Sequence, residues 1–170
     1  MALKRYIFSY FIICLLLSVT SCSTEFEKIR TSNDPELILK KAHQYFKDGD
    51  NYNAQALYEL SIQYFRGKAE AEDIYFNFAY TYYNTSDFTT ASQYFKTFCT
   101  TFQNSPKREE AYFMSAYSKY KLSPSFRLDQ TPSVKAIEEF QEFINAYPNS
   151  PRVVQCNKLI DEMRAKLEQK

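Results

Sequence analysis

Hydrophobic residues recur at steps of three, four or seven through two neighbouring stretches in the middle of the chain. Such steps place the side chains on one face of a helix. The polar run Thr85-Ser86-Asp87 separates the stretches, which predicts two helices that pack face to face across a tight turn. The first face carries Tyr75, Phe78, Ala79 and Tyr82, and the second carries Ala91, Phe95, Phe98 and Phe102.

The same pattern occurs three times. Ala42, Ala79 and Ala116 lie 37 residues apart, and each has an apolar residue four positions earlier. Twelve residues after the first two of these alanines come Ala54 and Ala91. The third copy is displaced by an insertion, Pro124–Thr131. Its members are Ala136, Phe140, Phe143 and Tyr147.

A small residue in each helix of a pair, followed by an aromatic residue, is typical of tetratricopeptide repeats, whose period is about 34 residues. We therefore predict an all-α tetratricopeptide-repeat solenoid, with repeats at about 34–68, 69–104 and 105–149. A plain helical bundle with chance periodicity is the alternative. A closing helix at 150–168 is expected to cover the last repeat with one apolar stripe. The stripe contains Val153, Cys156, Leu159, Ile160, Met163 and Leu167.

Several polar residues are expected to mark helix starts. Asp34-Pro35 has a capping aspartate followed by proline, a common first-turn combination. The pairs Ser105-Pro106, Thr131-Pro132 and Ser150-Pro151 are predicted to start helices in the same way. The pairs Glu109-Glu110 and Glu138-Glu139 are expected to lie on solvated helix faces.

The N-terminus predicts an export signal at residues 1–21. Lys4 and Arg5 precede the mainly apolar stretch Tyr6–Val19, which is short for a membrane span. Val19-Thr20-Ser21-Cys22 resembles the lipobox of bacterial lipoproteins. That resemblance implies that Cys22 carries a lipid, with residues 22–33 as a tether. An ordinary secretory signal with an incidental cysteine is the alternative.

The composition of the chain argues against several classes of function. The 21 basic and 20 acidic residues form no basic block, so we expect no nucleic-acid partner. With one histidine, His43, no glycine-rich phosphate loop and no Cys/His metal spacing, we expect no enzyme, cofactor or metal. Cys99 is expected to be a buried free thiol, although a Cys99–Cys156 disulfide stays open.

The segments KDGDNYNAQALYE from Lys47 and AIEEFQEFINAYPNSPR from Ala136, together with the lipobox and the insertion, resemble the BamD family. BamD is the lipoprotein of the outer-membrane β-barrel assembly machinery. The resemblance covers Asp34–Lys170. It implies a non-catalytic lipoprotein anchored in the outer membrane and facing the periplasm. Its implied partners are the barrel-forming subunit, other assembly lipoproteins and unfolded barrel proteins. Family members usually have about five repeats, so a shortened relative or a truncated chain is expected.

The resemblance also implies a peptide-binding groove along the first helices of the repeats. The implied positions lie three before, one after and four after each of the repeated alanines. They are Leu39, His43 and Phe46, then Phe76, Tyr80 and Tyr83, then Phe113, Tyr117 and Tyr120. Lys47, Asn84 and Lys121 would form the rim, and such an apolar groove suits an extended peptide with aromatic side chains. Packing of these rings between adjacent repeats is the alternative.

Two other functions stay open. A periplasmic repeat protein of the Tol–Pal type has similar repeats, but that family is soluble and carries a coiled coil before them. A glycan-capturing lipoprotein of an importer is also helical, but its sugar site is usually rich in tryptophan, and this chain has none.

Overall fold

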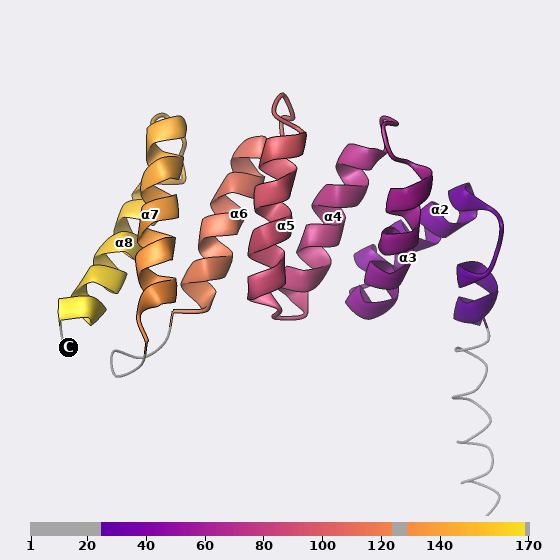
Figure 1. The fold of residues 1–170 in the computed structure, drawn as a ribbon, viewed down its shortest axis with the longest axis horizontal. Helices are drawn as coiled ribbons and strands as arrows, with labels where there is room; N and C mark the ends of the chain where they lie inside the picture. Colours follow the sequence, from indigo (N-terminus) through magenta and orange to yellow (C-terminus); the bar gives the residue numbers. More distant parts are fainter. Residues whose placement is uncertain (1–24, 124–128, 169–170) are drawn as a thin grey trace, which may run out of the picture.

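A computed structural model describes residues 25–123 and 129–168. Its labelled helices lie in one row, from α2 at one end to α8 at the other (Figure 1). The described part of the chain contains helices and turns but no strand. This arrangement confirms the all-α repeat fold. The helices are α2 (Pro35–Lys47), α3 (Asn51–Tyr64), α4 (Ala71–Asn84), α5 (Phe88–Thr101), α6 (Arg108–Lys121), α7 (Thr131–Ala146) and α8 (Val153–Glu168).

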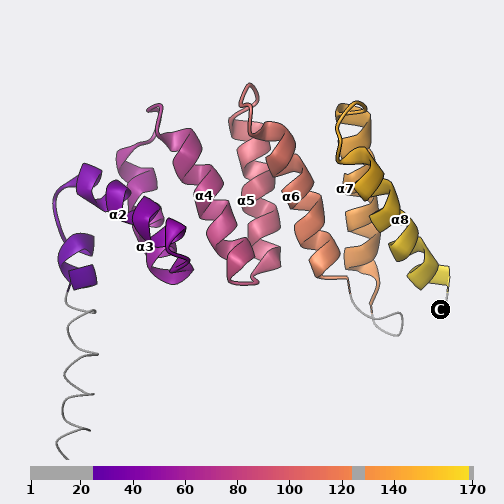
Figure 2. The same cartoon turned by 180° about the vertical axis from the view of Figure 1, so that it is seen from behind.

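Successive helices pack as pairs through their small residues. α2 pairs with α3, α4 with α5 and α6 with α7, and the row is seen from behind in Figure 2. All six repeated alanines are completely buried, because a methyl side chain lets two helix backbones approach closely. They are Ala42, Ala54, Ala79, Ala91, Ala116 and Ala136.

Aspartates cap three of the helices. The Asp34 carboxylate accepts a hydrogen bond from the backbone N–H of Leu37 at 3.1 Å, as predicted from the Asp-Pro pair. Asp50 and Asp87 cap α3 and α5 in the same manner. Each carboxylate pairs with a donor that the first helical turn leaves unsatisfied.

Two of the predicted helix starts are wrong by two to three residues. Ser105 and Ser150 do not cap helices, because α6 begins at Arg108 and α8 at Val153. Each serine oxygen instead accepts from the backbone N–H two residues later, in a turn that precedes the helix. The third pair lies at a helix start as predicted, since α7 begins at Thr131 with Pro132 in its first turn, but Thr131 does not cap the helix, whose N-cap residue is Gln130.

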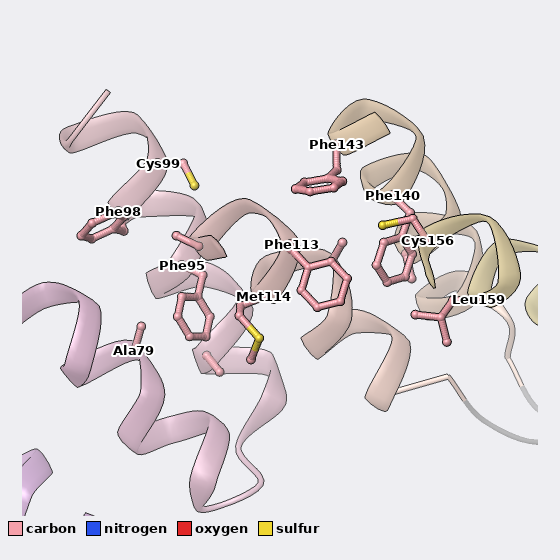
Figure 3. Close-up of a cluster of buried hydrophobic side chains, with 14 of the residues drawn as sticks. Ala79, Phe95, Phe98, Cys99, Phe113, Met114, Phe140, Phe143, Cys156 and Leu159 are labelled. Carbon is pink, nitrogen blue, oxygen red and sulfur yellow. The ribbon is translucent and has the colours of Figure 1, made fainter. Parts of the chain in front are cut away.

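In the second and third helix pairs the hydrophobic core is filled mainly by phenylalanines, which come from both helices of each pair. Figure 3 shows Phe95 and Phe98 of α5 beside Ala79, and Phe140 and Phe143 of α7 beside Phe113. All four of these α5 and α7 rings are completely buried. The buried residues form two clusters, one from residues 25–30 to α4 and one from α4 to α8, and the partly buried Tyr82 and Tyr94 pack against both.

Helix α8 covers the end of the row. Cys156, Leu159, Ile160 and Met163 are buried, whereas Val153 and Leu167 at the ends of the stripe are half-buried. Cys156 and Leu159 lie against Phe140 (Figure 3). The predicted stripe thus packs on α7. Cys99 and Cys156 are both buried and free, so the structure contains no disulfide between them.

A short helical segment, residues 25–30, covers the opposite end. Its Ile29 side chain is 5% exposed, and the Phe26 ring lies 6.1 Å from the Tyr45 ring of α2. Part of the stretch expected to serve as a tether is therefore packed on the first repeat. The predicted signal, residues 1–21, and Cys22 lie outside the described residues. Among the described helices, none combines the length and the apolar character that a membrane crossing requires.

Candidate functional site

A line of aromatic rings follows α4 and α6. We call Phe76, Tyr80, Tyr83, Phe113, Tyr117 and Tyr120 the aromatic ladder. Phe76 and Phe113 are 8% and 3% exposed and belong to the core. The four tyrosines are half-buried, so each presents part of its ring to solvent.

The ladder tyrosines contact one another across the boundary between repeats 2 and 3. The Tyr83 ring lies 6.3 Å from the Tyr80 ring of its own helix and 6.3 Å from the Tyr117 ring of α6. Tyr117 and Tyr120 stack at 5.6 Å with their planes 22° apart. These separations are favourable for aromatic pairs, so the four rings form one continuous surface.

Phenylalanines support the ladder from below. Phe76 packs against Phe98 at 5.3 Å and touches Tyr80 at 5.2 Å. Phe113 stacks on Tyr117 at 5.5 Å, and the Arg152 guanidinium lies 4.6 Å from the Phe113 ring on another side. The ladder tyrosines are thus held in place by contacts with buried phenylalanines of the core.

Two tyrosine hydroxyls donate hydrogen bonds to carboxylates of a later helix in the row. Tyr80 donates to Glu110 of α6 at 2.5 Å, and Tyr120 donates to Glu162 of α8 at 3.1 Å. Burial raises the pKa of both hydroxyls, and the adjacent carboxylates raise it further. Both tyrosines are therefore neutral donors at neutral pH, and they fix the spacing between α4, α6 and α8.

The predicted positions of repeat 1 do not continue the ladder. Leu39 is buried, and His43 and Phe46 pack against Tyr58 of α3. The His43 Nδ1 atom lies 2.8 Å from the Tyr58 hydroxyl, and burial lowers the His43 pKa. No ring contact in the described part of the chain joins these residues to the ladder.

The predicted rim residues are exposed. Lys47 and Lys121 lie at the ends of α2 and α6, and the Lys121 ammonium is 5.6 Å from the Phe88 ring. The Asn84 amide donates to Asn51 at 2.9 Å, which connects the helix turns of repeats 1 and 2. Asn84 therefore has a structural role, and the rim stays a prediction.

The expectation of solvated glutamate pairs is wrong for Glu139. Its side chain is buried on α7, where it pairs with Lys96 of α5 at 3.0 Å and with Lys119 of α6. Ser115 donates to the same carboxylate at 3.0 Å. Glu139 lies three residues after Ala136 and four before Phe143, so its position on the apolar face was a signal for burial. Glu109 and Glu110 are half-buried and accept hydrogen bonds from Ser150 and Tyr80.

Comparison with known protein families shows which family the chain belongs to. The family model of YfiO, described as an outer membrane lipoprotein, matches residues 31–170. The chain belongs to this family. The match covers all three helix pairs and α8, and thus the whole aromatic ladder. No curated protein matches the chain. Membership in the YfiO family confirms the resemblance to BamD-like lipoproteins.

Proposed function

We propose that this YfiO-family protein is a non-catalytic component of the β-barrel assembly machinery that binds unfolded barrel segments and supports the barrel-forming subunit. The protein would act by non-covalent binding at the aromatic ladder. Other assembly lipoproteins are further partners of the proposed complex. Family membership supports this function over a Tol–Pal protein or a glycan-capturing lipoprotein.

The observation that carries the proposal is the continuity of the half-buried tyrosines across two repeats. Rings held in place by neighbouring rings lose little conformational freedom on binding, and tyrosine is common among residues that dominate binding energy. The hydroxyls of Tyr80 and Tyr120 are engaged by carboxylates, which leaves the exposed parts of the rings as the proposed binding surface. An extended segment with alternating aromatic side chains suits such a surface.

The proposed location is the outer membrane, with the repeats in the periplasm and a lipid on Cys22 as the anchor. Each buried methylene of an acyl chain contributes about 0.8 kcal/mol, so several chains would hold the protein durably. Replacement of Cys22 by alanine is expected to move the protein into the soluble periplasmic fraction. Retention of that variant in the membrane would contradict the anchor.

Binding at the ladder can be tested with Tyr83→Ala combined with Tyr117→Ala. Both rings are half-buried, so their loss disturbs the fold less than the loss of the core residue Phe76. We expect the affinity for a peptide with the aromatic C-terminal strand of a barrel protein to fall about tenfold. Fluorescence titration of the folded variant measures this change.

Tyr94→Ala provides the matched control. Tyr94 is also half-buried and stacks on another tyrosine, Tyr82, at 5.1 Å, but it lies on α5 outside the ladder. The control should bind the peptide like the parent protein. Equal affinities of the ladder variant and the parent would exclude the ladder as the binding surface.

A further inference from the structure

A pocket of about 400 Å³ lies among α5, α6 and α7, away from the aromatic ladder. On α6 the pocket residues Lys119 and Leu122 lie on the opposite side of the helix from Tyr117 and Tyr120, because one residue advances a helix by about 100°. The volume falls in the range of small-ligand sites. The pocket is therefore a candidate binding site separate from the proposed peptide site.

Three lysines line this pocket, one from each helix. Lys96 and Lys119 both contact the same Glu139 oxygen, so two of the ammonium groups that line the pocket are held close together. The hydrogen bond and charge of Glu139 raise the pKa of Lys96, which keeps that ammonium protonated. One carboxylate thus offsets only one of these two positive charges.

Lys135 supplies the third positive charge. It lies on α7 one turn before Glu139, is exposed, and makes no ion pair with a described residue. Asp129 also lines the pocket, and its carboxylate accepts hydrogen bonds from the backbone N–H and the hydroxyl of Thr131. The three lysines against Glu139 and Asp129 leave a net positive charge.

The remaining walls are suited to an apolar chain with a polar end. Leu122 and Pro132 contribute apolar surface, while Ser92, Thr89 and Gln93 contribute hydroxyl and amide groups. Ser92 is buried, and its hydroxyl lies 3.3 Å from the Ser115 hydroxyl that binds Glu139. The lining thus combines ammonium, hydroxyl and amide groups with the apolar surface of Leu122 and Pro132.

We propose that this pocket binds a carboxylate at the end of an apolar chain, with the carboxylate between the lysines and the chain along Leu122 and Pro132. A carboxylate can accept charge-assisted hydrogen bonds from several ammonium groups at once. The same chemistry occurs at the C-terminus of a peptide with an apolar last residue and in an aliphatic acid.

Titration calorimetry of the full-length protein in lipid nanodiscs, with empty discs as the blank, tests this site. The probes are N-acetyl-Leu-Phe and hexanoate, each compared with its uncharged amide. We expect at least one acid to bind ten or more times more tightly than its amide, and the acid that binds identifies the source of the carboxylate. Binding of neither acid, or equal binding of acid and amide, would overturn the proposal.

Lys135→Gln tests the charge without disturbing Glu139. We expect it to weaken binding of the acid about fivefold while the unfolding midpoint stays unchanged. Lys158→Gln is the matched control, because Lys158 is an exposed lysine on α8, which contributes no residue to the pocket. Equal weakening by both variants, or by neither, would overturn the assignment. The ladder variants lie on the other face and should leave binding of the acid unchanged, so the two proposals can fail separately.

Discussion

Glu139 links three helices through one buried carboxylate. Burial would raise its pKa, but the hydrogen bonds and charges of Lys119 and Lys96 outweigh burial and lower the pKa below the ordinary 4.5. The carboxylate is therefore ionised in the folded protein at neutral pH. Its contribution to stability is present above the pKa of the unfolded chain and is lost as the pH falls through the lower folded value.

Replacement of Glu139 by glutamine is expected to lower the free energy of unfolding at pH 7 by about 1–3 kcal/mol, because two ammonium groups lose their partner. Urea unfolding at pH 7 and at several values below 4.5 measures the effect. The stability difference between parent and variant should shrink on acidification. The exposed neighbour Glu138, replaced by glutamine, serves as the control and should cost little. A difference that grows toward acid pH would contradict the lowered pKa.

Both buried thiols should be inert in the folded protein. Burial raises the pKa of Cys99 to about 11 and that of Cys156 to about 11, so little thiolate exists at neutral pH. We expect no maleimide labelling of either residue in native buffer and complete labelling in urea, as followed by peptide mass spectrometry. Rapid native labelling of Cys156 would show that α8 detaches from α7.

At the scale of residues, the sequence predicted those whose role follows from periodicity. The alanines and phenylalanines of the core lie where helical spacing places them. Glu139 was missed because its charge suggested solvent, whereas its burial depends on lysines from two other helices. Partners from distant segments cannot be read from spacing within one helix.

At the scale of elements, the turns of repeats 1 and 2 share one backbone geometry. Gly49 has a φ of 80°, and Ser86, which lies 37 residues later, has a φ of 64°. Left-handed conformations favour glycine because they bring the Cβ atom of other residues close to the backbone. The turn of repeat 1 therefore has glycine at its left-handed position, which is favoured, and the turn of repeat 2 has serine there, which is not.

Exchange of the two turn residues should have opposite effects. Ser86→Gly is expected to stabilise the protein by a few tenths to about 1 kcal/mol, and Gly49→Ser to destabilise it by about 1 kcal/mol. A Cβ atom on Gly49 would meet no atom within 4 Å, so backbone conformation alone determines the cost. Thermal unfolding of both variants gives the signs. Destabilisation by Ser86→Gly would show that the serine side chain has an unrecognised role.

Element boundaries were predictable where a side chain caps a helix directly. Asp34 caps α2 as expected, whereas α7 starts at the predicted place with Pro132 in its first turn but without a side-chain cap. Ser105 and Ser150 were misassigned because each donates to a glutamate of the preceding repeat, Glu72 at 2.7 Å and Glu109 at 2.6 Å. Those bonds between repeats hold the serines in turns before α6 and α8.

At the scale of the whole molecule, the row of helices has different covers at its two ends. Helix α8 covers one end with a long apolar stripe, and residues 25–30 cover the other with Ile29 and Phe26. Repeat arrays need such covers because each repeat buries its apolar surface only against its neighbours. Residues 25–30 form the smaller of the two covers, so we expect them to be the less stable end of the row.

Ile29→Ala should therefore loosen the first repeat selectively. We expect faster amide hydrogen exchange in residues 25–30 and α2, with little change in α6 to α8, because truncation of a buried isoleucine costs about 2–4 kcal/mol locally. Lys28→Ala, an exposed neighbour, is the control. Uniformly faster exchange along the row would mean that the repeats open together.

The overall fold was predictable because three copies of one pattern repeat the same signal. The sequence did not predict that only six of the nine expected groove positions would form the ladder, because this depends on which rings meet across helices. Tyr83 meets Tyr117, whereas His43 and Phe46 meet Tyr58 within their own repeat. Spacing fixes the face of a helix but not the partner in the next one.

The packed segment at residues 25–30 also limits how far the protein can stand from a bilayer. Only Ser23 and Thr24 separate Cys22 from this segment, and three residue steps of extended chain reach about 11 Å. With Cys22 acylated as proposed, residues 25–30 would lie close to the lipid headgroups, whose layer is about 5–7 Å deep. The repeats would then pivot about a nearly fixed point, and the α8 end would have the widest reach toward a neighbouring subunit.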